Sequence, residues 1–360
     1  MRVLFYHTGR SWTGSSRAFT VAARGLQERG EQVTVVCRTD TPAEQAFARD
    51  GIEVVSLPIS DAVSRDAWRL RTVLKEKFTE VVFVHTEPEQ LVVSSAMRMA
   101  ERGGVIRRVP AGGRIVDGRG GKWASRMATV RPLFSTAMDL QRANLPDALI
   151  APLGVDVARI EDNRDASRAL LGIEPETQLI VCVADRTTKP RVTTALRTLA
   201  LLAERHPDLR LALVGSGDDD DTHMHAAALG VTPLVRFLGE RDDMAAVVGA
   251  ADVGWVAADG DDGAFACLDF MAARVPVIAE RSPLLSHYVP DGISGVLLPP
   301  AAPSDTAATV ANFLADNNQR AAMGKAGRTR VARDFPESAM IEGFLAAATA
   351  AGDRAGWTAR

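Results

Sequence analysis

Residues 3–36 carry the pattern from which the fold is predicted: Val3-Leu4-Phe5-Tyr6, a segment with helical spacing at 16–29, and Val33-Thr34-Val35-Val36. The two short runs are rich in β-branched and aromatic side chains, as buried strands are. A strand, a helix and a second strand in this order form a βαβ unit, whose two strands run parallel. The stretch therefore predicts an α/β fold built on a parallel sheet.

The same alternation continues through the first half of the chain. Further strands are predicted at 52–55, 81–84 and 148–150, and further helices at 66–77 and 122–143. The Gly-rich stretch 103–121 is interpreted as irregular.

A second series starts at Leu179-Ile180-Val181-Cys182-Val183. Strands are predicted at 211–214, 234–238, 253–256 and 275–279, and helices at 192–205, 222–229, 242–250, 264–273, 303–317 and 319–350. The sequence thus predicts two Rossmann-like doubly wound domains facing a central cleft, where ligands of such folds bind. We expect domains at 1–155 and 156–335, with a final helix at 336–360 that crosses back to the first domain.

The composition is that of a globular protein. The 360 residues are 46% hydrophobic and 24% charged, with a formal net charge of −3, which excludes a disordered or collagen-like chain. Cys37, Cys182 and Cys267 form no Cys-x-x-Cys pair, so a reducing compartment is expected. No apolar run approaches the roughly 18 residues of a membrane span. We therefore expect a cytoplasmic protein without signal peptide or transmembrane helix.

Three strand-to-helix turns are candidates for binding phosphate, because a helix N-terminus offers free N–H groups and the positive end of the helix dipole. They are Gly9–Ser16, Gly215-Ser216-Gly217 and Ala258–Gly263. The first lacks the Gly-x-Gly-x-x-Gly spacing and no acidic residue ends the second strand, so a dinucleotide site is not expected.

A cationic turn follows the first strand of the second series. It carries Arg186, Lys189 and Arg191, and three positive charges can neutralise a diphosphate without a metal ion. The alternative is a solvated, Arg-rich loop, since the chain has only five lysines among its 42 basic residues. For the same reason Lys189 is the more informative of the three.

At this point the chain resembles the family 4 retaining glycosyltransferases of the GT-B fold, over essentially its whole length. The matching motifs are Gly154-Val155-Asp156, Arg186 with Lys189, Gly215-Ser216-Gly217, Phe237-Leu238-Gly239 and Asp291-Gly292-Ile293-Ser294-Gly295-Val296-Leu297. The resemblance implies transfer of a sugar from a UDP- or GDP-sugar to an acceptor, with retention of configuration and with neither metal nor cofactor.

The resemblance also assigns roles to single residues. Arg186 and Lys189 stabilise the diphosphate, Asp261 holds the donor sugar and Asp269 the ribose. The backbone near Phe237 and Leu238 holds the base, and His85 lies near the donor sugar. The further donor-binding candidates are Gly14, Gly215, Gly217, Asp262 and Gly263.

Each assignment has a simpler alternative. Asp261 can cap a helix, Asp269 can be a surface charge, and His85 can be a polar loop residue. The family has Glu where this chain has Asp261 and Asp269, and Gly where it has Arg274. Its Gly-Gly-x-Pro-Glu loop has become Pro283-Leu284-Leu285-Ser286-His287, so this is a divergent member.

Two further clusters invite interpretation. Asp218-Asp219-Asp220-Asp221 precedes His223 and His225, but helix capping explains the run better than a metal site. The stretch 102–131 holds eight basic residues against Asp117, namely Arg102, Arg107, Arg108, Arg114, Arg119, Lys122, Arg126 and Arg131.

This basic stretch has two candidate ligands, an anionic acceptor that is lipid-linked or a small molecule, and the anionic face of a membrane. A solvated face is the alternative, and nucleic acid is not expected because aromatic residues are not interleaved. Two other functions remain open for the chain as a whole: a catalytically silent GT-B scaffold, and a nucleotide-sugar epimerase.

Overall fold

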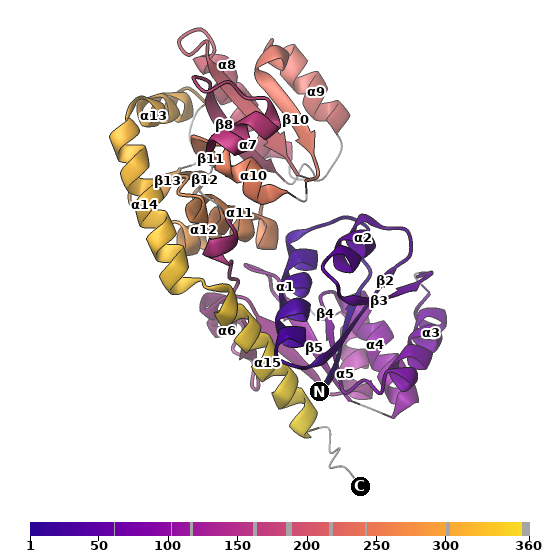
Figure 1. Cartoon of the computed structure of the whole chain (residues 1–360). Helices are drawn as coiled ribbons and strands as arrows, with labels where there is room; N and C mark the ends of the chain where they lie inside the picture. Colours follow the sequence, from indigo (N-terminus) through magenta and orange to yellow (C-terminus); the bar gives the residue numbers. More distant parts are fainter. Residues whose placement is uncertain are drawn as a thin grey trace. The chain divides into compact units, whose positions relative to one another are not determined.

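The computed structural model describes residues 1–60, 62–101, 103–115, 118–160, 164–184, 189–215, 219–241, 243–299 and 303–354 (Figure 1). These residues divide into two compact units. The first comprises Met1–Leu153 together with the last helix, α15 (Glu337–Arg354), and the second comprises Gly154–Pro336. Each unit is built on one parallel sheet, so the predicted α/β class with two Rossmann-like domains is confirmed.

The first unit has, within the described residues, a seven-stranded sheet in the order β3-β2-β1-β4-β5-β6-β7. Its strands are β1 (Arg2–His7), β2 (Gln32–Arg38), β3 (Glu53–Leu57), β4 (Val81–Val84), β5 (Gly104–Val109), β6 (Val130–Phe134) and β7 (Leu149–Ile150). Its other helices are α1 (Gly14–Glu28), α2 (Pro42–Arg49), α3 (Val63–Glu76), α4 (Glu87–Ala100), α5 (Arg119–Met127) and α6 (Ala137–Ala143). The strand order reverses between β1 and β4, the point at which ligands of such sheets bind.

Aromatic side chains join α1 and α15 to the first sheet. Phe5 of β1 stacks on Phe83 of β4 with ring centroids 4.9 Å apart, and Phe19 of α1 lies edge-on to Phe5. Phe344 of α15 packs against Phe83 with centroids 5.2 Å apart. Although α15 follows the second unit in sequence, it is part of the core of the first (Figure 1).

Two sequence predictions for the first unit are wrong. The stretch 103–121, interpreted as irregular, contains β5, and the helix predicted over 122–143 is interrupted by β6 between α5 and α6. Arginines stand in both strands, so neither gives the continuous apolar run that signals a buried strand. Helices α2 and α4 were not predicted either.

Three arginines of the basic stretch are buried. Arg108, only 1% exposed, donates a hydrogen bond to Ser135 Oγ at 2.9 Å. Arg131 donates to the backbone carbonyl of Ala350 in α15 at 2.6 Å. Arg107 is buried as well. These three side chains lie inside the unit, which corrects the prediction that they belong to a ligand-binding patch.

The second unit has, among its described residues, a six-stranded sheet in the order β10-β9-β8-β11-β12-β13. Its strands are β8 (Gln178–Ala184), β9 (Leu209–Val214), β10 (Val235–Gly239), β11 (Val253–Ala257), β12 (Val277–Glu280) and β13 (Gly295–Leu298). Its helices are α7 (Arg164–Leu171), α8 (Lys189–Leu202), α9 (Asp219–Ala228), α10 (Met244–Gly249), α11 (Gly260–Ala272), α12 (Pro283–Tyr288), α13 (Pro303–Ala315) and α14 (Asn317–Asp334), with short 3₁₀ turns η1 (Val157–Arg159) and η2 (Thr232–Leu234). Here the order reverses between β8 and β11.

The sequence predicted the second sheet better than the first. Each strand and helix expected between 179 and 279 is present, with shifted ends. Helices α7 and α12 and strand β13 were not predicted. The helix expected over 319–350 is wrong, because it is interrupted at Phe335 and Pro336 between α14 and α15. A proline disfavours the helical conformation in the residue before it, and Phe335 has φ −133° and ψ 45°, outside the helical region.

One motif of the resemblance has a structural explanation. Asp291 accepts a hydrogen bond from the backbone N–H of Leu297 at 2.9 Å, which closes the turn before β13. Gly292 has a φ of +73°, and a Cβ on Gly295 would lie 2.1 Å from the carbonyl oxygen of Val277. The aspartate and both glycines of the Asp-Gly-x-x-Gly-x-Leu motif thus shape the entry into β13.

Candidate functional site

The turn after β9 is held tightly against the end of β8. Gly215 has a φ of +135°, and a Cβ added there would lie 1.9 Å from the carbonyl oxygen of Ala184. Its N–H donates to the carbonyl oxygen of Gly239 at 2.9 Å, which joins the ends of β9 and β10. Only glycine fits this position without moving the backbone.

Several predicted residues of the diphosphate turns fall outside the described residues. These are Arg186, Gly217 and their neighbours at 185–188 and 216–218. Lys189 is the first residue of α8. The helix therefore begins within the predicted cationic turn, five positions after Ala184, the last residue of β8.

Helix α11 begins after the carboxyl end of β11, the strand that lies beside β8 in the sheet. Asp259 is its N-cap residue, and Asp261 and Asp262 lie in its first turn. A Cβ on Gly263 would lie 2.3 Å from the carbonyl oxygen of Ala258, so a glycine is needed for the helix to start this close to β11. The helix begins at Gly260, four residues before the predicted start.

Asp261 and Asp269 are both buried, each 3% exposed. Asp269 is therefore not a surface charge, and Asp261 is not the N-cap residue, so both simpler alternatives are wrong. Eight residues of α-helix place the two backbone positions about 12 Å apart along the axis. The pair can therefore contact two separate groups of an extended ligand.

Arg191, the third cation of the predicted turn, is already engaged by carboxylates. Its guanidinium lies 2.6 Å from Asp259 Oδ1 and 2.9 Å from Glu280 Oε2. Burial tends to lower the pKa of Arg191, but these two carboxylates more than offset that effect, so the pKa is raised. The group stays charged and is held between α11 and the end of β12.

The Phe237-Leu238-Gly239 turn ends β10. Phe237 stacks on His223 of α9 with ring centroids 3.5 Å apart, and the pairing register with β9 shifts at Leu238. His223 thus has a packing role. In the part of the chain that the structure describes, no three His, Cys, Asp or Glu side chains gather as a metal site.

In the first unit, His85 lies at the end of β4 and is 7% exposed. Its ring stacks on Phe19 with centroids 3.6 Å apart, and its Nε2 lies 2.9 Å from the carbonyl oxygen of Ser15. A carbonyl oxygen only accepts, so Nε2 carries the proton and donates. His85 therefore ties β4 to the first turn of α1, which begins at Gly14.

A buried glutamate that the sequence analysis did not select joins β1 to β4. Glu89 accepts hydrogen bonds from the N–H and hydroxyl of Thr8 through Oε1, and from the N–H groups of His85 and Thr86 through Oε2, at 2.7–3.0 Å. Thr86 and Glu89 form a capping box at the start of α4. The Thr-x-x-Glu spacing was the signal in the sequence that could have identified it.

His7 is a second buried residue that the sequence analysis did not select. It ends β1, is buried, and its Nε2 lies 3.0 Å from Ser16 Oγ in α1. Burial lowers the pKa of His7, and the nearby Glu89 carboxylate only partly opposes this. Gly9 lies directly on the ring, since a Cβ there would be 2.7 Å from Nε2. A neutral histidine thus supports the first Gly-rich turn.

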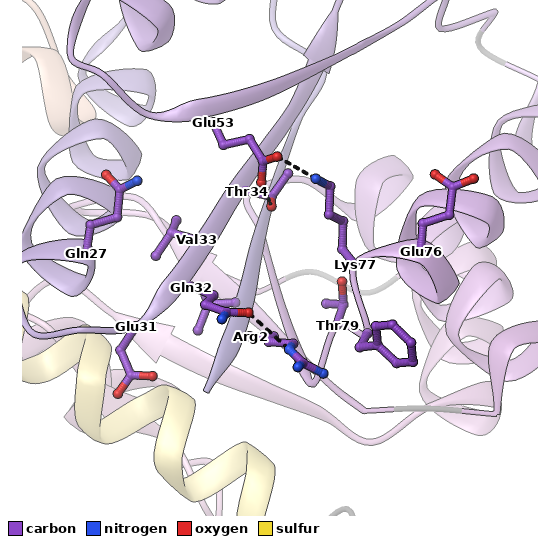
Figure 2. Close-up of a pocket in the computed structure, with 12 residues that line it drawn as sticks. Arg2, Gln27, Glu31, Gln32, Val33, Thr34, Glu53, Glu76, Lys77 and Thr79 are labelled. Atoms are coloured by element: carbon purple, nitrogen blue, oxygen red, sulfur yellow. Dashed lines mark hydrogen bonds and ion pairs between the residues drawn. The ribbon is translucent and has the colours of Figure 1, made fainter.

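A cavity of about 420 Å³ lies at the opposite edge of the first sheet, at the amino ends of its strands (Figure 2). Its polar side chains contact one another. Arg2 donates to Gln32 Oε1 at 3.1 Å, while Glu53 accepts from Thr34 at 2.8 Å and pairs with Lys77. Since ligands of such sheets bind beyond the carboxyl ends, the candidate site is placed at that edge of each unit.

Two family models match the chain. The one described as "Glycosyl transferase 4-like domain" matches residues 13–171, and the one described as "Glycosyl transferases group 1" matches residues 163–330. The D-inositol 3-phosphate glycosyltransferase of Corynebacterium jeikeium (strain K411) is 32% identical over an alignment of 200 residues, and the match covers 51% of this chain and 47% of the relative. The chain spans about half the length of the curated relatives it matches.

Solved structures are similar over almost the whole chain. Anabaena Alr3699/HepE in complex with UDP-glucose has a TM-score of 0.78 at 15% identity, covering 97% of this chain and 100% of that one. WaaG, a glycosyltransferase involved in lipopolysaccharide biosynthesis, has a TM-score of 0.74 at 18% identity, covering 98% and 99%. At these identities the likeness shows a common fold.

Proposed function

Because the chain belongs to the GT4-type glycosyltransferases with the GT-B fold, we propose that it transfers a sugar from a nucleotide-sugar donor to an acceptor. We propose further that the transfer retains the configuration of the sugar and uses no metal ion. The observation that carries the proposal is the buried pair Asp261 and Asp269 on α11, a helix that begins where the strand order of the second sheet reverses.

The proposed roles follow the chemistry of each group. Lys189, the first residue of α8, and Arg186, three positions before it in the sequence, neutralise the charge that builds up on the diphosphate as the sugar leaves. Asp261 accepts hydrogen bonds from the sugar hydroxyls, and Asp269 accepts them from the ribose. The leaving phosphate itself takes the proton of the attacking hydroxyl, so the reaction needs no separate histidine base.

Two observations support a donor site in the second unit. Burial makes a carboxylate costly unless it is hydrogen-bonded, which favours Asp261 and Asp269 as specific contacts rather than incidental charges. Gly215 holds the ends of β8, β9 and β10 together. The phosphate-binding turns therefore start from a fixed edge.

The first test is donor binding followed by transfer. Calorimetric titration with UDP, GDP and ADP and with their sugars identifies the nucleotide. We then expect Lys189→Ala to abolish transfer while the fold is retained, and Asp269→Asn to weaken nucleotide binding. Lys325→Ala changes another of the five lysines, an exposed one in α14, and serves as the matched control. Unchanged turnover in Lys189→Ala contradicts the proposed role of the cationic turn.

The same experiment separates the alternatives, which the family matches do not favour. A chain that binds none of the nucleotides or nucleotide-sugars is a scaffold rather than a transferase. A chain that converts the donor to a new sugar nucleotide without any acceptor is an epimerase. Transfer that persists after metal chelation, with the anomeric configuration preserved by NMR, supports the full proposal.

We propose that an exposed face of α5 contacts an anionic, lipid-linked acceptor or the cytoplasmic membrane surface. The α5 basic face consists of Arg119, Lys122, Trp123 and Arg126, at the spacing that places side chains on one side of a helix. All four are exposed, Trp123 by 51%. Arg114 is exposed nearby in sequence, while Arg102 and Asp117 lie outside the described residues.

The contact is peripheral in this proposal, and none of the described helices has an apolar stretch long enough to cross a membrane. Each Arg or Lys near an anionic surface contributes about 1 kcal/mol. We expect the protein to sediment with phosphatidylglycerol vesicles and not with phosphatidylcholine vesicles. Reversing the charges of Lys122 and Arg126 should abolish sedimentation, whereas Lys325→Glu should not. Equal sedimentation of all three proteins refutes the proposed face.

A further inference from the structure

Arg191 links three elements at the edge of the second sheet where the donor is proposed to bind. It extends from the first turn of α8 to Asp259, the N-cap residue of α11, at 2.6 Å. It also reaches Glu280, the last residue of β12, at 2.9 Å. Since β11 lies between β8 and β12 in the sheet, the ion pairs run across the end of β11, beside the point where the strand order reverses.

These ion pairs are easily broken. The carboxylates of Asp259 and Glu280 are 53% and 47% exposed, so water competes for both. Exposed ion pairs contribute little to stability. The guanidinium is better shielded, at 21% exposed, and forms its strongest contacts with planar or tetrahedral oxyanions such as phosphate. A diphosphate is therefore a strong competitor for this guanidinium.

The position of Asp259 adds to the competition. Its side chain makes no capping hydrogen bond to the first turn of α11, so the carboxylate is held there by Arg191 and by the positive end of the helix dipole. Both of these also attract a phosphate. The three carboxylates Asp259, Asp261 and Glu280 at this edge would otherwise repel a dianionic donor.

We propose that Arg191 is a latch on the donor site. In the donor-free protein Asp259 and Glu280 hold its guanidinium, and on binding the diphosphate of the donor replaces these carboxylates. This inference rests on the proposed function and adds a competition built into the site. The latch offsets part of the carboxylate charge at this edge when the donor is absent. It lowers the affinity for free nucleotide by the strength of the ion pairs that must break.

The alternative is a permanent brace, in which the two ion pairs simply hold α8 against α11. The two arrangements predict opposite effects of the same substitution. If Glu280 competes with the diphosphate, Glu280→Gln frees Arg191 and strengthens binding. If the ion pair supports the site, Glu280→Gln weakens binding, as loss of Arg191 does.

The test is calorimetric titration with UDP and GDP, the two diphosphates of the proposed donors. For whichever binds, we expect Glu280→Gln to tighten binding about two- to fivefold, the range set by one exposed ion pair. Arg191→Gln should weaken binding. Asp259→Asn should tighten binding of the diphosphate in the same way as Glu280→Gln. It provides a second variant if the Glu280→Gln protein folds poorly. Asp334→Asn removes the ion pairs of Asp334 with Arg330 and Arg333 in α14 and should have no effect.

A double variant separates the latch from simple repulsion between charges. In the Arg191→Gln background, Glu280→Gln should give no further gain, because no guanidinium remains to be released. Uridine, which lacks phosphates, should bind equally to the wild type and to Glu280→Gln. A gain that persists without Arg191, or a loss of affinity in Glu280→Gln, overturns the latch. If the wild type binds none of UDP, GDP and ADP or their sugars, the proposed function itself fails and the latch with it.

Discussion

Replacing Glu89 by glutamine should loosen the first unit and leave the second unchanged. The carboxylate accepts four hydrogen bonds in a buried position, from Thr8, His85 and Thr86. A glutamine of the same shape keeps one oxygen acceptor and replaces the other with an NH₂ group, which cannot accept. The backbone N–H groups that face the NH₂ lose their partner.

The size of the effect follows from the orientation that the amide takes. If the NH₂ faces Thr8, the hydroxyl can turn and accept from it, so only the N–H of Thr8 loses its acceptor. If the NH₂ faces the other side, the N–H groups of His85 and Thr86 both lose theirs. The first orientation is therefore preferred. Loss of one hydrogen bond to a charged group costs about 1.5–3 kcal/mol.

Hydrogen exchange measured segment by segment is the suitable assay, because the chain has two units and a single unfolding midpoint would mix them. We expect amides of β1 and β4 to exchange about 10- to 150-fold faster in Glu89→Gln, the equivalent of 1.5–3 kcal/mol. Amides of β8 and β11 should be unchanged. Glu87→Gln is the matched control in the same helical turn, since Glu87 is less buried and, among the residues that the structure describes, accepts hydrogen bonds from Gly118 and Gly121. Equal protection of β1 and β4 in the wild type and in Glu89→Gln refutes the reasoning.

Two further predictions concern pH and backbone strain. Burial holds the pKa of His7 below its ordinary value of 6.5. As the pH falls below about 6.5, the unfolded chain therefore takes up a proton that the folded chain does not. The first unit should lose stability between pH 7.5 and pH 5, and the His7→Gln protein should lose less, as measured by amide exchange rates in β1. Arg274 follows the C-cap residue of α11 and has a φ of +58°. A non-glycine residue in this left-handed conformation costs about 1–2 kcal/mol, whereas glycine costs about 0.5–1 kcal/mol through its greater freedom in the unfolded chain. Arg274→Gly should therefore stabilise the second unit by about 0.5–1 kcal/mol in urea unfolding, and Gly292→Ala, at a φ of +73°, should destabilise it. A less stable Arg274→Gly protein contradicts the assumed strain.

The sequence predicts elements well where burial and hydrophobicity coincide. Strand β8 reads Gln-Leu-Ile-Val-Cys-Val-Ala and was predicted within one residue at each end. Strands β5 and β6 were missed because Arg107, Arg108 and Arg131 stand in them. These arginines are buried with hydrogen-bond partners that lie far away in sequence, among them a backbone carbonyl of α15. A local pattern contains no information about such partners.

The candidate site was likewise predicted only in part from the sequence. The sequence placed Asp269 within the predicted helix and Asp261 just before it, whereas α11 contains both. The burial of Asp269 was not predicted, since a carboxylate in a helix is usually exposed. The pairing of Arg191 with Glu280 joins residues 89 positions apart. These side chains meet only when the sheet has formed, so no local sequence motif predicts the pair.

The place of α15 bears on how the protein is made. Residues of the second unit are synthesised before α15, yet Phe344 and the carbonyl of Ala350 complete the interior of the first unit. Domains usually fold in the order in which they leave the ribosome. Here the second unit is one continuous segment and can finish early, while the first keeps a hydrophobic strip beside α1 uncovered until translation has passed residue 350. The end that is made first is therefore the last to be completed, and this interval is when the nascent chain is most exposed to aggregation.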